Sequence, residues 1–168
     1  MKSKVLLRSA LAVLLILSLS LSLAACQEEK THQYCELGIV LPRSFKKSDT
    51  QESFDLALSD GRIFVGMLRI SLAAASEAQI PTTMSPLKLA EYYLDETFSG
   101  AVIPEIVTEG DIPYYSYTSG TDTKHLYVQT FYVTPYAYFI ITFITPESTS
   151  EEILEEILGY ASTVYMEI

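Results

Sequence analysis

The stretch Tyr138-Phe139-Ile140-Ile141-Thr142-Phe143-Ile144-Thr145 carries large apolar side chains at both sets of alternating positions. Successive side chains of a β-strand point to opposite faces of a sheet. One face would therefore receive Phe139, Ile141 and Phe143, and the other Tyr138, Ile140 and Ile144. A sheet with one face in water alternates apolar and polar residues, so this strand predicts a sheet that is covered on both faces.

Turn residues join this strand to other β-rich runs, which predicts antiparallel pairing. Pro135 connects it to residues 124–134, and Ser119-Gly120 precedes that run. Asp60-Gly61 joins residues 54–59 to residues 62–71, and Asp-Gly is favoured in two-residue hairpin turns because both positions adopt positive φ. Further strands are expected at residues 37–41, 105–107 and 112–117, with a loop through Lys46 and Lys47.

Two amphipathic helices are available to cover the two faces. Ser85-Pro86 predicts a helix start with Ser85 as the N-cap, and a capping box predicts a second start at Thr149 to Glu152. The expected apolar stripes are Leu87, Ala90, Leu94 and Phe98 in the first helix and Ile153, Leu154, Ile157, Leu158 and Ala161 in the second. Residues 72–84 are expected to form a connection with one helical turn. The sequence thus predicts a single α+β domain over residues 34–168.

This order of elements resembles the Mog1/PsbP-like α/β/α sandwich. The residues that carry the resemblance are Leu37 to Pro42, Ile112 to Tyr115 and Tyr138 to Phe143. The resemblance implies an antiparallel sheet with helices on both faces, and it transfers no functional residue because fold does not fix function. Members of that fold group are mostly binding or assembly proteins, including a partner of a small GTPase and an extrinsic photosystem subunit.

The N-terminal segment has the layout of an export signal, with Lys2, Lys4 and Arg8 before an apolar run to Leu23. Its end, Leu23-Ala24-Ala25-Cys26, resembles the lipobox of bacterial lipoproteins. The resemblance implies a signal peptide over residues 1–25 and two or three acyl chains on Cys26, which would hold the protein on the extracytoplasmic face of the cell membrane. Residues 26–33 would then form a polar tether. The alternative is an ordinary signal peptide or an uncleaved anchor.

Charge and cysteine content restrict the partners. From Cys26 onward the chain has 8 basic and 21 acidic residues, a net charge of about −13, which repels nucleic acid and anionic lipid headgroups. With Cys26 lipidated, only Cys35 remains, so no intrachain disulfide is expected. Cys35 is expected to be a small buried hydrophobe. A reactive thiol and an intermolecular bridge are the alternatives.

No sequence motif predicts catalysis, a cofactor or a metal. The chain lacks a glycine-rich phosphate loop, a nucleophile elbow, a paired-cysteine zinc motif and a His-Glu-x-x-His helix. His32 is expected to be solvated in the tether, and His125 to be structural or exposed. Glu109, Asp111 and Asp122 could hold calcium, but their spacing does not match an EF-hand loop. We therefore expect no catalytic residue, no cofactor and no metal.

Tyrosines supply the one candidate binding patch. Seven of the twelve tyrosines fall between Tyr114 and Tyr138, and their hydroxyls need hydrogen-bond partners, so some should reach the surface. Tyr132, Tyr136 and Tyr138 are predicted to form one aromatic cluster near the turn at Pro135. We expect Tyr138 to belong to the core and Tyr136 to lie on the surface.

These observations favour a non-enzymatic binding or assembly module that engages an envelope protein, a peptide or a glycan. The alternatives are a cell-envelope hydrolase and a small solute-binding lipoprotein. A cleft that gathers carboxylates with His125 would favour the hydrolase, a deep pocket would favour the solute-binding protein, and an exposed aromatic patch would favour the binding module.

Overall fold

The computed structural model describes residues 28–49, 53–98, 103–108, 110, 112–147 and 150–167. The large sheet has the strand order β3 (Lys46–Lys47), β4 (Leu56–Ser59), β5 (Phe64–Ser71), β8 (Ala137–Pro146), β7 (His125–Val133) and β6 (Tyr114–Ser119). The small sheet has the order β1 (Glu29–Tyr34), β2 (Leu37–Pro42) and β9 (Tyr165–Met166). Neighbouring strands pair antiparallel in both sheets, as the turn residues predict.

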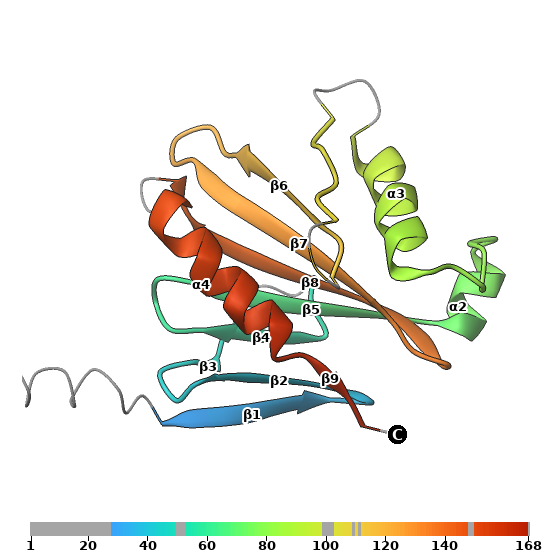
Figure 1. Ribbon diagram of the computed structural model, residues 1–168, viewed down its shortest axis with the longest axis horizontal. Helices are drawn as coiled ribbons and strands as arrows, with labels where there is room; N and C mark the ends of the chain where they lie inside the picture. The colour runs from blue at the N-terminus through green and yellow to red at the C-terminus, as the bar shows by residue number, and fades with distance from the viewer. Residues whose placement is uncertain are drawn as a thin grey trace, which may run out of the picture.

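Both faces of the large sheet are covered, which confirms the predicted α+β class. One face, here the α4 face, packs against helix α4 (Ser150–Ser162) and the small sheet (Figure 1). The opposite face, here the α3 face, packs against α2 (Leu72–Glu77) and α3 (Pro86–Thr97). Among the described helices, none is long and apolar enough to cross a membrane.

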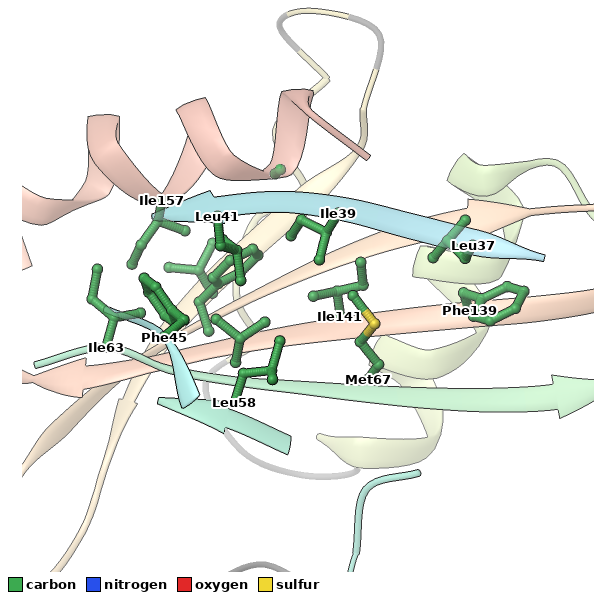
Figure 2. Close-up of a cluster of buried hydrophobic side chains, with 14 of the residues drawn as sticks. Leu37, Ile39, Leu41, Phe45, Leu58, Ile63, Met67, Phe139, Ile141 and Ile157 are labelled. Carbon is green, nitrogen blue, oxygen red and sulfur yellow. The ribbon is translucent and has the colours of Figure 1, made fainter. Parts of the chain in front are cut away.

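The core on the α4 face joins segments from the two ends of the chain. Figure 2 shows Leu37 of β2 directed toward Phe139 of β8, and Ile39 of β2 directed toward Ile141 of β8 and Met67 of β5. Helix α4 adds the buried side chains of Ile153, Ile157 and Ala161, which belong to its predicted stripe. Alternation along β8 sends Phe139, Ile141 and Phe143 into this core and Tyr138 and Ile140 into the other.

The core on the α3 face forms around α3, whose predicted start is confirmed. The Ser85 hydroxyl accepts a hydrogen bond from the Lys88 amide at 3.3 Å, and Pro86 is the first helical residue. Leu89, Ala90 and Leu94 are buried, whereas Leu87 is 38% exposed, so its assignment to the buried stripe was wrong. The first turn of α3 is rotated so that Leu89 faces the sheet. The capping box predicted at Thr149 lies outside the described residues.

The connection between β4 and β5 is longer than the predicted two-residue turn. Ser59 pairs with Phe64, which leaves four residues in the loop. The Asp60 carboxylate accepts hydrogen bonds from the amides of Arg62 at 2.8 Å and Ile63 at 2.7 Å. Gly61 has φ = 91°, a left-handed conformation that favours glycine. The carboxylate of Asp60 therefore holds a wider loop closed.

The prediction of a polar tether over residues 26–33 is wrong from Glu29 onward. Residues from Glu29 onward form β1, which pairs along its length with β2. The side of β1 that faces inward carries His32, which is half-buried, with its Nε2 lacking a hydrogen-bond partner among the described residues. Burial and then the charges of Lys30 and Lys46 lower the pKa of His32, so it is not simply solvated.

Cys35 and two short strands also differ from the prediction. Cys35 is exposed in the β1–β2 turn, where φ = 51° places it outside the strand, so the expected burial was wrong. Lys46 and Lys47, expected in a loop, form β3. Strand β9 was not predicted, and its Tyr165 ring covers Gly38 so closely that a Cβ there would lie 2.5 Å from the ring. Residues 1–25 and Cys26 lie outside the described residues.

Candidate binding groove between helix α4 and strand β6

A groove with a volume of about 440 Å³ lies on the α4 face beside the C-terminal half of α4. Strands β6 and β7 form its floor, α4 forms one wall, and the segments before β6 and after α4 close its ends. The lining residues in the described part of the chain are Gly110, Ile112, Tyr114, Tyr132, Leu158, Ala161, Ser162 and Val164. Most of these side chains are apolar, and none carries a charge.

The strand order explains why the groove forms there. Strand β6 is the last strand of the large sheet, and the small sheet packs beside α4 at the β4 and β5 side (Figure 1). On the α4 face, the surface beside β6 is therefore bordered by α4 on one side and by no further strand of the sheet on the other. Leu158 is half-buried at this margin, whereas Ile157, one position earlier, is fully buried in the core.

Tyr132 fixes the position of α4 over the groove floor. Its hydroxyl donates a hydrogen bond to the backbone carbonyl of Ala161 at 2.8 Å. That carbonyl belongs to the last turn of α4 and also accepts a hydrogen bond from the Val164 amide at 3.2 Å. Burial raises the pKa of the Tyr132 hydroxyl, which keeps it protonated and able to donate. The predicted patch residue Tyr132 is thus a structural part of the groove.

Tyr138 lies on the opposite face of the large sheet, so the predicted cluster of Tyr132, Tyr136 and Tyr138 does not form. Tyr132 pairs with Phe139, and Val133 pairs with Tyr138, so the two tyrosines project to opposite faces. Tyr138 is fully buried among the residues under α3, as expected for a core residue. Its hydroxyl donates to the Pro81 carbonyl at 2.7 Å and accepts from the Met84 amide at 3.2 Å.

Tyr136 lies at the tip of the β7–β8 hairpin and is 65% exposed, as predicted for a surface residue. The Thr134 hydroxyl holds this tip by accepting hydrogen bonds from the amides of Tyr136 at 3.2 Å and Ala137 at 2.9 Å. Tyr136 is therefore accessible but stands apart from the other two predicted patch residues. Its role in binding stays a prediction.

An ion pair lies near the same hairpin and was not predicted. Arg69 donates two hydrogen bonds of 3.2 Å to the Glu36 carboxylate, and the Thr134 hydroxyl donates a third at 3.2 Å. Burial raises the pKa of Glu36, but the hydrogen bonds from Arg69, the backbone and Thr134, together with the charge of Arg69, outweigh it, so the pKa lies below its ordinary value. The ion pair ties the β1–β2 turn to β5, and sequence reasoning missed it because both partners lie far apart in the chain.

The α3 face holds an aromatic cluster that accounts for several of the other tyrosines. The rings of Tyr117 and Tyr127 stack with centroids 5.0 Å apart, and Phe98 meets Tyr117 edge to face at 4.8 Å. The Tyr115 hydroxyl is buried without a hydrogen-bond partner among the described residues. Packing on this face, as well as surface exposure, explains the concentration of tyrosines in the strands.

The other candidate residues are not brought together into a reactive site. His125 begins β7 and is half-buried opposite Ser119 and Pro146. Glu109 and Asp111, two of the three candidate calcium ligands, lie outside the described residues, and the third, Asp122, is exposed. In the described part of the chain, no three His, Cys, Asp or Glu side chains are grouped closely enough to hold a metal ion.

Comparison with solved structures identifies the fold. The solution structure of cyanobacterial PsbP (CyanoP) from Synechocystis sp. PCC 6803 matches with a TM-score of 0.54 and 10% sequence identity. The match covers 84% of this chain and 94% of that chain. At this identity the likeness shows the fold alone, and it confirms the predicted PsbP-like fold. No protein-family model and no curated protein matches the chain.

Proposed function

We propose that this chain, which has the PsbP-like fold, is a non-enzymatic binding module that is held on the extracytoplasmic face of the cell membrane by lipid on Cys26. Its binding site is the groove between α4 and β6, and its partner is a protein of the cell envelope. The groove is the observation that carries the proposal. Its volume of about 440 Å³ falls within the range of about 300–1,000 Å³ typical of ligand sites.

The chemistry of the groove supports binding of apolar groups. Ile112, Leu158 and Val164 offer apolar surface, and the Tyr132 hydroxyl is already engaged by the carbonyl of Ala161. Burial of apolar side chains from a partner is therefore the main source of affinity, since it stabilises a complex in proportion to the area removed from water. None of the described lining residues carries a charged group that could polarise a bond.

The N-terminal sequence supports the anchoring part of the proposal. The basic residues, the apolar run and the Leu23-Ala24-Ala25-Cys26 sequence agree with a lipoprotein signal over their whole length. Two acyl chains hold a protein stably, because each buried methylene contributes about 0.8 kcal/mol. The first described residues, from Glu28, follow Cys26 after one residue, so β1 would lie close to the bilayer.

Photo-crosslinking in the native cell tests the groove directly. Benzoylphenylalanine replaces Tyr114 in the groove or Tyr136 at the exposed hairpin tip, because both substitutions keep an aromatic ring. We expect a crosslinked envelope protein from position 114 and none from position 136. Adding Leu158→Arg should abolish the crosslink from position 114, because a cation would then occupy the apolar wall.

Ile103→Arg provides the matched control for Leu158→Arg. Ile103 is exposed and does not line the groove, so this variant should keep the crosslink. Melting temperatures of both variants establish that the chain still folds. A crosslink from position 136 alone, or one from position 114 that survives Leu158→Arg in a folded chain, would place the binding site elsewhere.

A further inference from the structure

Strand β6 has an open outer edge next to the groove. It ends the large sheet, with β7 on its inner side. On its outer side the Val107 amide donates to the Tyr114 carbonyl at 2.8 Å, and the Tyr114 amide donates to the Val107 carbonyl at 3.1 Å. This bridge is isolated, and no other described residue bonds to the outer backbone edge of β6.

The bridge identifies the backbone groups that remain available. In an antiparallel ladder, alternate residues direct both N–H and C=O to the same neighbour. Because the backbone N–H and C=O of Tyr114 point outward to Val107, the backbone N–H and C=O of Ser116 and Thr118 also point outward. Among the described residues before Val107, none bonds to these groups, and Ile106 packs in the apolar cluster on the α3 face. Figure 1 shows this segment passing between β6 and α3.

The other edge strands of the described structure are protected, and β6 is not. Strand β3 consists of two lysines, β9 has two residues, and β1 begins with Glu29 and Lys30. Short length and charged side chains are the usual means by which edges avoid pairing with another chain. Strand β6 has six residues, Tyr-Tyr-Ser-Tyr-Thr-Ser, without a charge or a proline. Its edge is thus the one suited to accept a further strand.

The groove lies on the side to which alternate residues of an added strand would point. Tyr114 lines the groove, and Ser116 and Thr118 project to the same face of the sheet. A strand paired with β6 would send every second side chain over this face toward Leu158 of α4. Backbone hydrogen bonds would then supply affinity, and the groove would select apolar side chains at alternate positions.

We propose that β6 accepts an extended segment of a cationic partner protein as an additional strand, with alternate apolar side chains filling the groove. This proposal rests on the proposed function and specifies how the partner binds. Charge complementarity favours a cationic segment, because the chain from Cys26 onward carries about −13. Glu155 is exposed and precedes the lining residue Leu158 by three positions, which places the two side chains on the same side of α4.

A second copy of this chain fits the site poorly. Two chains of about −13 repel each other. Moreover, a second β6 would bring Ser116 and Thr118 to an apolar groove, where their hydroxyls would lose water without gaining partners. A heterologous segment with apolar alternate residues avoids both costs.

Selection from a library of random peptides against the full chain in detergent tests the proposal. We expect the enriched peptides to alternate apolar residues with Lys or Arg. The best synthetic peptide should shift the backbone amide resonances of Ser116 and Thr118. N-methylation of its alternate amides that face β6 should raise Kd about tenfold or more, while N-methylation of the intervening amides should leave Kd unchanged.

Protein variants give a second measurement. Ser116→Pro removes an outward N–H without breaking a bond to β7, so it should weaken binding about tenfold. Enriched peptides without alternation, failure to enrich any peptide, or equal effects of both N-methyl sets would overturn strand addition. A crosslink from position 114 would still uphold the proposed function in those cases. The chain could instead form dimers as its concentration rises, with slower hydrogen exchange of the β6 amides. That result would show that β6 pairs with a second copy of the chain, and it would overturn the proposal.

Discussion

The hydroxyl of Tyr132 lies 2.8 Å from the backbone carbonyl oxygen of Ala161 and joins the large sheet to the last turn of α4. Tyr132→Phe removes this donor and leaves the carbonyl with only its 3.2 Å hydrogen bond from the Val164 amide. We expect a loss of about 1 kcal/mol in the free energy of unfolding, measured by urea titration. Tyr136→Phe is the matched control, because Tyr136 is exposed, and should leave the stability unchanged. Equal stabilities of both variants would show that the Tyr132 bond contributes nothing.

Tyr138 and Tyr136 should respond differently to truncation. Tyr138→Ala opens a cavity under α3 and removes the hydroxyl that bonds Pro81 and Met84, so we expect a loss of about 3–5 kcal/mol. Tyr136→Ala should change the free energy of unfolding by less than about 0.5 kcal/mol. Thermal and urea unfolding measure both. A large loss in the Tyr136 variant would assign that ring a structural role.

These two tyrosines also show how far the sequence determines the fold. The alternating pattern of β8 predicts two covered faces and places Tyr138 in the core, and the structure confirms both. The pattern cannot show which face of β7 meets which face of β8, because each strand has apolar residues on both. The pairing of Val133 with Tyr138 decides this, and it depends on the hairpin connection held by Thr134.

The groove could not be predicted for a related reason. Periodicity identifies the apolar stripe of α4, but it does not say how far the helix extends over the sheet. Leu158 belongs to that stripe and yet lies at the groove margin, because β6 is an edge strand. Strand β1 was missed because its residues are polar, and β9 because two residues carry no periodic signal.

Lowering the pH should destabilise the chain through His32. Burial and the charges of Lys30 and Lys46 lower the pKa of His32 in the folded state. The unfolded chain therefore binds more protons at this site, and its stabilising effect, complete above about pH 6.5, is lost as the pH falls. We expect the urea midpoint of the wild type to fall more than that of His32→Gln between roughly pH 7.5 and 5.5. Parallel curves for the two proteins would contradict this.

Gly159→Ala should stabilise the chain. Gly159 is an exposed residue within α4, and none of the described residues has an atom outside the helix backbone within 4 Å of the position that a Cβ would occupy. Glycine costs about 0.5–1 kcal/mol relative to alanine in a helix, so the variant should gain about that amount in urea unfolding. A loss of stability would indicate that the backbone at this position needs the freedom of glycine.

The anchoring proposal predicts the behaviour of Cys26→Ser. If Cys26 carries the acyl chains, this variant should incorporate no labelled fatty acid and keep its signal segment when expressed in the native cell. Mass spectrometry and membrane fractionation measure both results. Cys35→Ser, which changes the exposed cysteine of the β1–β2 turn, is the control and should be labelled as the wild type is. Normal labelling of Cys26→Ser would remove the lipid anchor from the proposed function.

Strand β2 pairs with β1 on one side and with β9 on the other, and its apolar face is sheltered by α4. The ribosome synthesises β2 early. Met166, which pairs with Leu37, and Ile157, which belongs to the same core as Ile39, are synthesised only near the end of translation. Such distant pairings form slowly, because a long loop must close before they add stability. Until α4 and β9 have been made, the core on the α4 face therefore lacks these partners. If the chain is exported as proposed, this late completion of the core would leave it unfolded while it crosses the membrane.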